Sequence, residues 1–241
     1  MPETLVLLHG FGGTRRAWDA VVPELGGERY RPVALDLRGH GEAADAEPSF
    51  EGCLQDVLAV APERFALCGY SLGGRIAQQV ALAAPERVTR LVLVSTTAGI
   101  DDPDERAARR AADAALAEEI EAMSPEEWAE RWMSVPLFAG TPPDAAARWR
   151  EDLLRNDPRR IAAVLRALGT GVMTPLWDRL GELEMPVTVV VGERDAKYRA
   201  LADRYRTLLS RVEVVVIPGA GHGLPREAPR ELAAAILGEP S

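Results

Sequence analysis

Residues 65–74 read Phe-Ala-Leu-Cys-Gly-Tyr-Ser-Leu-Gly-Gly, so that an apolar run passes through a glycine-serine-glycine turn into a segment rich in Ala, Gln and Val. A G-x-S-x-G pattern between a strand and a helix forces a sharp turn, and only glycine tolerates the crowding two positions before and after the serine. The turn lifts the serine oxygen to the tip of a sheet, where it faces the N-terminus of the helix. We therefore predict that Ser71 is a nucleophile or a base and not an ordinary turn serine.

Two polar residues that follow apolar segments later in the chain can act with this serine. Asp195 comes just after the β-branched run Val187–Val191, and His222 follows Val212–Ile217 through a glycine-rich loop. Parallel strands collect ligand-handling residues at their carboxyl edge, so we expect both side chains to lie beside Ser71. A histidine can take the serine proton, and a carboxylate can hold the imidazole in the useful tautomer. The order serine, acid, histidine is the one expected of an α/β-hydrolase.

Other residues of the same types compete for these roles. His9 and His40 each follow a predicted strand, but both sit in tight glycine-flanked loops before the serine, and we interpret them as structural. Among the acids, Asp36 precedes the serine and Glu193 is a near neighbour of Asp195. The segment after residue 94 offers no carboxylate before residue 101. We therefore assign the acid of the triad to Asp195.

The segment His9-Gly10-Phe11-Gly12 supplies a fourth catalytic part. A glycine-flanked turn directly after the first predicted strand leaves backbone N–H groups free to point at a developing negative charge. We predict an oxyanion hole formed by the N–H of Phe11 and the N–H of Leu72. Each such donor contributes on the order of 3 kcal/mol in the transition state.

Composition and charge limit the classes of partner. The formal net charge of −9 argues against nucleic acid or an anionic membrane as a partner. Met1–Thr4 leads directly into a predicted strand, and no apolar run approaches the ~18 residues of a membrane span. The three histidines and two cysteines show no metal-ligand spacing. We expect a cytoplasmic monomer that acts on a small molecule without a metal or cofactor.

Strand and helix signals alternate along the chain, which predicts an α/β fold with a mostly parallel sheet flanked by helices. The predicted strands are Thr4–Leu8, Val33–Leu35, Phe65–Cys68, Arg90–Val94, Val187–Val191 and Val212–Ile217. About 90 residues between Ser95 and Pro186 carry helix signals and no convincing strand. We predict a single α/β-hydrolase domain over residues 1–241, with residues 97–184 inserted as a helical cap over the active site.

The cap contains the candidates for substrate selection. In the segment Asp104–Met123, the larger apolar residues Ala112, Leu116, Ile120 and Met123 recur at helical spacing, and Arg109 falls on the same stripe. An arginine on an apolar face needs an anion, which is either a substrate or Asp113 four residues on. By periodicity Arg155 is a charge at the end of a helix. Trp132 either lines a pocket or fills the core of the cap.

Four stretches resemble the 2-succinyl-6-hydroxy-2,4-cyclohexadiene-1-carboxylate synthases of menaquinone biosynthesis, and the likeness extends over nearly the whole chain. They are the serine motif Gly69–Arg75, the arginine-rich start of a helix at Glu105–Arg109, the cap segment Arg155–Val172, and the acid motif Gly192–Tyr198. The resemblance implies that Tyr70, Arg109, Trp132 and Arg155 bind substrate. It also implies an elimination in which a carbon-bound proton of a cyclohexene carboxylate is removed and pyruvate leaves.

The triad is compatible with more than this one reaction. Ser71 relayed through His222 can act as a base in the elimination, while cap arginines offer bidentate contacts to substrate carboxylates. An ordinary serine hydrolase, such as an esterase or lactonase that forms an acyl-enzyme, needs the same triad. A ligand-binding receptor without catalysis would need a degraded triad, which this sequence does not have. Lyase and hydrolase therefore differ in the cap, where an esterase pocket favours apolar residues.

Overall fold

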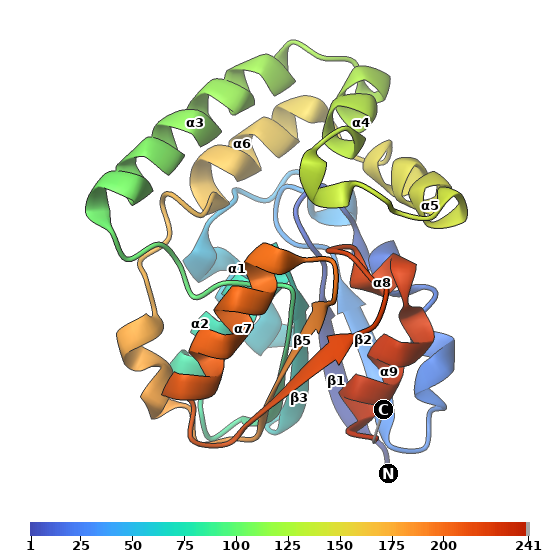
Figure 1. Cartoon of the computed structure of the whole chain (residues 1–241), viewed down its shortest axis with the longest axis vertical. Helices are drawn as coiled ribbons and strands as arrows, with labels where there is room; N and C mark the ends of the chain where they lie inside the picture. Colours follow the sequence, from blue (N-terminus) through green and yellow to red (C-terminus); the bar gives the residue numbers. More distant parts are fainter. Residues whose placement is uncertain (240–241) are drawn as a thin grey trace.

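The computed structural model describes residues 1–239, and a six-stranded parallel sheet forms its centre (Figure 1). The strand order is β2-β1-β3-β4-β5-β6, and every neighbouring pair is parallel. The strands are β1 (Glu3–Leu8), β2 (Tyr30–Leu35), β3 (Phe65–Tyr70), β4 (Val88–Val94), β5 (Val187–Gly192) and β6 (Val212–Ile217).

Each predicted strand is present, and the largest difference lies at the start of β2. This strand begins at Tyr30, three residues before the predicted Val33, although Pro32 lies within it. Proline cannot donate a ladder hydrogen bond and is tolerated in an edge strand. Because β2 is at the edge of the sheet, Pro32 does not end the strand.

Helices cover both faces of the sheet. Alternate residues of β1 enter two separate apolar clusters, Val6 and Leu8 on one face and Leu5 and Leu7 on the other. The first cluster includes residues of α1, α2 and α7, and the second includes residues of α9. The helices are α1 (Phe50–Val60), α2 (Leu72–Ala83), α3 (Pro103–Glu121), α4 (Pro125–Met133), α5 (Pro143–Leu153), α6 (Pro158–Leu168), α7 (Ala196–Leu208), α8 (Leu224–Glu227) and α9 (Pro229–Leu237).

The segment α3–α6, which we call the cap, joins β4 to β5 and lies above the carboxyl ends of the strands (Figure 1). It has an apolar cluster of its own, to which Trp128, Phe138, Trp149 and Ile161 contribute. Side-chain hydrogen bonds cap the N-termini of α3, α4 and α6; at α6, for example, the Asp157 side chain accepts from the N–H of Arg159. The cap is thus a packed unit placed over the edge where the catalytic residues were predicted.

The buried face of α3 differs from the predicted stripe. Its fully buried residues are Asp113, Ala117 and Ile120, while Leu116 is half-buried and Ala112 is exposed. The helix packs mainly against α6, and this contact turns the face that contains Asp113 inward. The sequence pattern misses this rotation because the buried residue is a carboxylate, which a search for apolar positions ignores.

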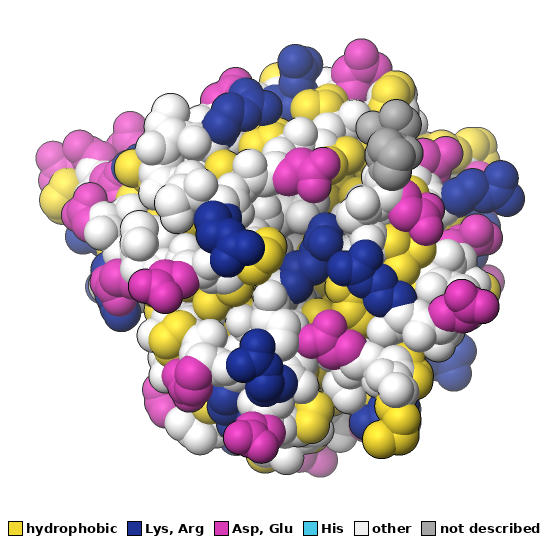
Figure 2. Space-filling model, turned by 90° about the horizontal axis from the view of Figure 1, so that it is seen from below, with side chains coloured by type: hydrophobic (Ala, Val, Ile, Leu, Met, Phe, Trp, Pro, Cys, Tyr) yellow, Lys and Arg dark blue, Asp and Glu magenta, His cyan; other side chains and the backbone are white. Residues whose placement is uncertain are grey.

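The opposite end of the molecule, at the amino ends of the strands, carries acidic and basic side chains interspersed with apolar ones, and no histidine is visible there (Figure 2). Among residues 1–239, no helix combines the length and apolar character needed to cross a bilayer.

Helix α2 approaches β1 through a glycine. The N–H of Gly73 donates to the carbonyl oxygen of His9 at 3.0 Å, and a Cβ on Gly73 would lie 2.3 Å from the carbonyl oxygen of Leu8. No side chain fits at this distance, so the contact requires glycine.

Replacing Gly73 with alanine should destabilise the fold by about 1–3 kcal/mol, because the methyl group would overlap a backbone atom of the central sheet. Urea unfolding followed by circular dichroism measures the loss. Gly181→Ala is the matched control, since nothing lies within 4 Å of that position, and it should change stability by less than about 0.5 kcal/mol. Equal and small changes in both variants would contradict the constraint.

Candidate active site

Ser71 occupies a strained turn between β3 and α2. Its backbone dihedrals are φ 51° and ψ −107°, a region that residues with side chains rarely adopt. The turn is possible because Gly69 and Gly73 touch: a Cβ on Gly69 would lie 2.3 Å from the carbonyl oxygen of Gly73. The glycines of the motif therefore have the steric role predicted from the sequence, and the turn presents the Ser71 side chain above the sheet edge.

The structure brings Ser71, Asp195 and His222 together. The Nδ1 atom of His222 lies 2.7 Å from Oδ2 of Asp195, and its Nε2 atom lies 3.3 Å from Oγ of Ser71. The side chains of His222 and Asp195 are each 2% exposed. A carboxylate in this position fixes the imidazole with its proton on Nδ1, which leaves Nε2 able to accept the serine proton. The geometry is that of a relay from serine to histidine.

Glu227 holds the loop that carries the histidine, a role that the sequence analysis missed. Its carboxylate accepts from the N–H of Gly221 at 2.8 Å and from the N–H of Gly223 at 3.0 Å, so both neighbours of His222 are held. Arg194 neutralises this buried carboxylate at 2.8 Å. A glutamate one turn after a glycine-flanked histidine is a signal that could have indicated this contact.

The two residues predicted to form the oxyanion hole lie close to Ser71. Phe11 follows β1 and lines the cavity beside Ser71, and Leu72 is the first residue of α2. Among residues 1–239, neither backbone N–H donates a hydrogen bond. Free N–H groups at a helix N-terminus and a glycine-flanked turn are suited to hold negative charge.

A cavity of about 660 Å³, counted out to its open mouth, lies between the triad and the cap. Tyr70, Arg109 and Trp132, three of the four residues predicted to contact substrate, line it. The ring of Tyr70 packs 5.5 Å from the imidazole of His222, and burial raises the pKa of the Tyr70 hydroxyl. Trp132 also contacts the apolar cluster of the cap, and among residues 1–239 its indole N–H has no hydrogen-bond partner.

Arg75 is a buried cation in the wall of this cavity. Its guanidinium donates to the carbonyl oxygen of Leu168 at 2.5 Å, and no carboxylate of residues 1–239 forms an ion pair with it. Burial lowers the pKa of Arg75 to about 10, so it remains charged at neutral pH. Sequence reasoning missed this residue, although it lies one helical turn after Ser71. An unpaired buried guanidinium is suited to bind an anion.

Arg109 pairs with Asp113 and also lines the cavity, so the structure is compatible with both alternatives that the sequence left open. Its Nε donates to Oδ1 of Asp113 at 2.7 Å, which is the predicted i,i+4 pair, and its side chain is 40% exposed. The same residue lines the cavity beside the triad and a neighbouring groove that includes Lys197 and Arg204. Asp113 therefore orients Arg109 at the cavity and leaves part of the guanidinium accessible.

The structure does not bring Arg155 to the cavity. This residue follows α5, is exposed, and lines surface hollows that do not include the triad, two of them at the junction of the cap with the sheet domain. The chain turns at the end of α5, so that the next residue, Asn156, is buried in its place. The geometry gives no support to the predicted substrate contact of Arg155.

The described part of the chain contains no cluster of three or more His, Cys, Asp or Glu side chains that could hold a metal ion. Both cysteines are buried, and burial raises the pKa of the Cys53 thiol to about 11.

A family model described as the alpha/beta hydrolase family matches residues 5–235. The chain belongs to the α/β-hydrolase family. It is 34% identical to a 2-succinyl-6-hydroxy-2,4-cyclohexadiene-1-carboxylate synthase of Klebsiella pneumoniae, with 96% of this chain and 91% of that protein covered. The predicted family and fold are confirmed, and the chain is an enzyme of this family that resembles these synthases.

Two solved structures show how far the likeness extends. MenH from S. aureus superposes with a TM-score of 0.91 at 29% identity, covering 98% of this chain and 92% of that one. A thermophilic esterase from Thermogutta terrifontis, solved with malate bound, has a TM-score of 0.79 at 29% identity, covering 99% of this chain and 89% of that one. The solved structures that resemble this chain thus include both a MenH protein and an esterase.

His9 and His40 are structural, as predicted. Both are fully buried, with ring centroids 4.8 Å apart. Nε2 of His9 accepts from the N–H of Leu37 at 3.0 Å, and Nε2 of His40 accepts from the N–H of Gly12 at 3.1 Å. Burial lowers the pKa of His9 and holds that of His40 well below its ordinary value, and the neighbouring His9 lowers the pKa of His40 further.

The triad should act as a unit in catalysis. Ser71→Ala, Asp195→Asn and His222→Ala should each lower kcat by orders of magnitude, and the triple variant should be little worse than the poorest single variant. Steady-state kinetics checks the rates, and circular dichroism checks that the fold survives. Multiplicative losses in the triple variant would contradict the relay.

Stability should fall as the pH decreases below about 6.5, because the unfolded chain then binds protons that the folded chain excludes from His9 and His40. Each histidine contributes a slope of up to about 1.4 kcal/mol per pH unit in this range. Urea unfolding at pH 7.5 and pH 5.5 measures the effect. His40→Asn should reduce the slope, and an unchanged slope would mean that His40 is protonated in the folded chain.

Proposed function

We propose that this enzyme is a cofactor-free lyase that eliminates pyruvate from a succinyl-cyclohexene carboxylate, the reaction of the synthases that it resembles. The single observation that carries the proposal is the unpaired, buried Arg75 in the wall of the triad cavity. A polycarboxylate substrate would supply the anion that the chain itself does not provide. The relatives named for this reaction are matched over nearly their whole length, which supports the same assignment.

The residues of the cavity have distinct parts in this reaction. Nε2 of His222 accepts the hydroxyl proton of Ser71. Oγ of Ser71 then acts as the base that removes a proton from a substrate carbon. Negative charge then develops on a substrate oxygen near that carbon, and the N–H groups of Phe11 and Leu72 stabilise it. Arg75 and Arg109 bind carboxylates, and Trp132 offers an indole N–H beside them.

The proposal includes the division of the chain into parts. We treat residues 1–241 as one α/β-hydrolase domain and residues 97–184 as its cap, because Arg109 and Trp132 reach the cavity from α3 and α4 while the triad comes from the sheet edge. The substrate is thus enclosed between two groups of residues that are far apart in the sequence.

Hydrolysis of a small ester is the second candidate, and one comparison favours it. The Thermogutta esterase shares 29% of its residues with this chain over nearly its whole length. Ser71 would then attack the ester carbonyl and form an acyl-enzyme, with the same two N–H groups holding the oxyanion. This candidate gives Arg75 no role with a neutral ester.

Loss of the cavity arginines should separate the two candidates. Arg75→Gln and Arg109→Ala should each weaken turnover of the cyclohexene carboxylate by about 2–4 kcal/mol in kcat/KM, the scale for losing a charge-assisted contact in a partly dry site. A neutral p-nitrophenyl ester, if the wild type hydrolyses it, should be turned over almost unchanged. Parallel assays of both substrates make the comparison.

Arg155→Ala is the matched control, because this arginine belongs to the same cap and lies outside the cavity. It should change neither rate by more than about two-fold. Equal losses on both substrates in the Arg75 and Arg109 variants would show that these arginines hold the cap in place. Negligible losses on the carboxylate would overturn the lyase assignment and favour the esterase.

A further inference from the structure

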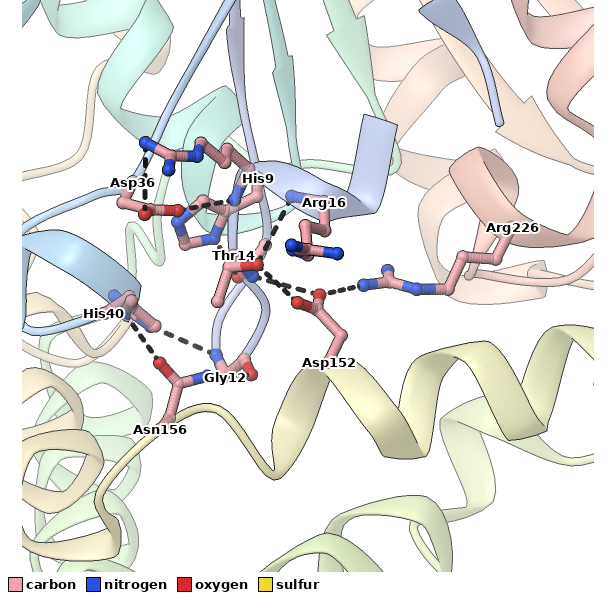
Figure 3. Close-up of polar contacts among 12 residues, drawn as sticks. His9, Gly12, Thr14, Arg16, Asp36, His40, Asp152, Asn156 and Arg226 are labelled. Atoms are coloured by element: carbon pink, nitrogen blue, oxygen red, sulfur yellow. Dashed lines mark hydrogen bonds and ion pairs between the residues drawn. The ribbon is translucent and has the colours of Figure 1, made fainter. Parts of the chain in front are cut away.

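The loop that follows β1 is held by side chains of the cap and by one histidine (Figure 3). At Gly12 both backbone groups are engaged: the N–H donates to Nε2 of His40 at 3.1 Å, and the carbonyl accepts from Nδ2 of Asn156 at 2.8 Å. Gly12 has φ 74°, so its conformation is one that few other residues adopt. The peptide groups on both sides of this residue are therefore fixed.

Asn156 can make these contacts in only one orientation. Its Oδ1 accepts from the N–H of Gly41 at 2.9 Å while its Nδ2 donates to Gly12, so the amide bridges two loops of the sheet edge. The residue is 3% exposed and lies in the turn between α5 and α6. A buried amide with its donor and acceptor both used is held rigidly, because rotation would leave polar groups unpaired.

Asp152, one turn earlier in α5, makes a second attachment to the same loop. Its carboxylate accepts from the N–H of Thr14 at 3.0 Å and from the Thr14 hydroxyl, and it pairs with Arg226 (Figure 3). Both charged side chains are about 95% buried, at 4% and 5% exposure. The loop is thus held at residues 12 and 14 by one end of α5.

Phe11, whose N–H we assign to the oxyanion hole, immediately precedes the clamped glycine. A donor stabilises the transition state only within a narrow range of distance to the developing charge, and a shift of about 1 Å can cost ~10²-fold in rate. Asn156 and Asp152 do not line the cavity, so they can act on catalysis only through the segments that they hold, and Asn156 makes no contact with the loop of His222.

We propose that Asn156 is a positioning residue that sets the oxyanion hole, so that the end of α5 fixes the loop that carries the Phe11 donor. The inference rests on the oxyanion role given to Phe11 under the proposed function. Both the elimination and the hydrolysis use this hole, and the inference does not depend on which of them the enzyme performs.

The test compares Asn156→Ala with Arg160→Ala. Arg160 lies in α6 and pairs with Asp45 at 2.7 Å on the exposed surface, so its loss removes a cap–core contact without affecting a hydrogen bond of residues 10–14. With the cyclohexene carboxylate, Asn156→Ala should lower kcat roughly 10- to 100-fold and leave KM within about three-fold. The control should leave both constants within about two-fold. A change in KM alone, or equal effects of the two substitutions, would overturn the proposal.

A second readout is independent of the natural substrate. An alkyl fluorophosphonate phosphonylates a reactive serine: the Ser71 oxygen–phosphorus bond forms, fluoride leaves, and His222 takes the proton. The P=O oxygen enters the oxyanion hole, so labelling followed by mass spectrometry should slow roughly 10- to 100-fold in Asn156→Ala and not in Arg160→Ala. If the wild type is labelled but does not convert the cyclohexene carboxylate, the proposed function fails while this test still decides the present inference.

Two further variants keep the test decisive if the alanine variant does not fold. Asn156→Asp, assayed at pH 8, retains the size of the side chain and the acceptor for the Gly41 N–H but loses the donor to Gly12, and it should slow labelling similarly. His40→Ala removes the other contact of Gly12, and its effect on labelling should be non-additive with that of Asn156→Ala. Unchanged labelling in Asn156→Asp, or strict additivity in the double variant, would overturn the proposal.

Discussion

The contact between Gly73 and the end of β1 is the constraint on which the site geometry depends. Gly73 lies two residues after Ser71, and its N–H donates to the carbonyl oxygen of His9, which lies two residues before Phe11. Because no side chain intervenes, the distance between the serine turn and the oxyanion loop is set by backbone atoms alone. The strained conformation of Ser71 is held by this backbone contact together with the Thr96 hydroxyl, which donates to the Ser71 carbonyl oxygen at 2.7 Å.

A buried ion pair between the cap and the sheet domain also constrains the geometry of the site. Taking Asp152 and Arg226 out of water costs free energy that their attraction only partly offsets, so this ion pair is a weak source of stability. The pair matters more for the positions of the segments that it connects. Asp152 belongs to α5 and holds Thr14, while Arg226 belongs to α8, which directly follows the loop of His222. One cap side chain thus joins the two loops that carry the chemistry.

The sequence predicted those parts of the site that local patterns encode. Asp195 and His222 follow β-branched strands, and parallel pairing brings such positions to one edge whatever the rest of the chain does. Periodicity predicted Arg155 as a charge at the end of a helix, and it lies exposed just after α5, but periodicity could not place Asn156, because the helical rule of 100° per residue ends where α5 ends. The turn buries the amide and exposes the guanidinium, and only the packing of the cap against the sheet edge determines which of the two faces inward.

Arg75 shows why overall charge is a poor guide to what an active site accepts. The chain has a net charge of −9, yet most of its ion pairs lie at the surface, where each contributes little. In the cavity the balance is reversed, since Arg75 has no carboxylate partner in residues 1–239 and Arg109 shares only one. The first turn of α2 gives no sign in the sequence that this guanidinium is buried, because the groups that it contacts, the Leu168 carbonyl and the Phe50 ring, belong to other parts of the chain. An anionic substrate that enters this cavity meets positive charge at short range, while the repulsion of the distant acidic surface is screened by water and salt.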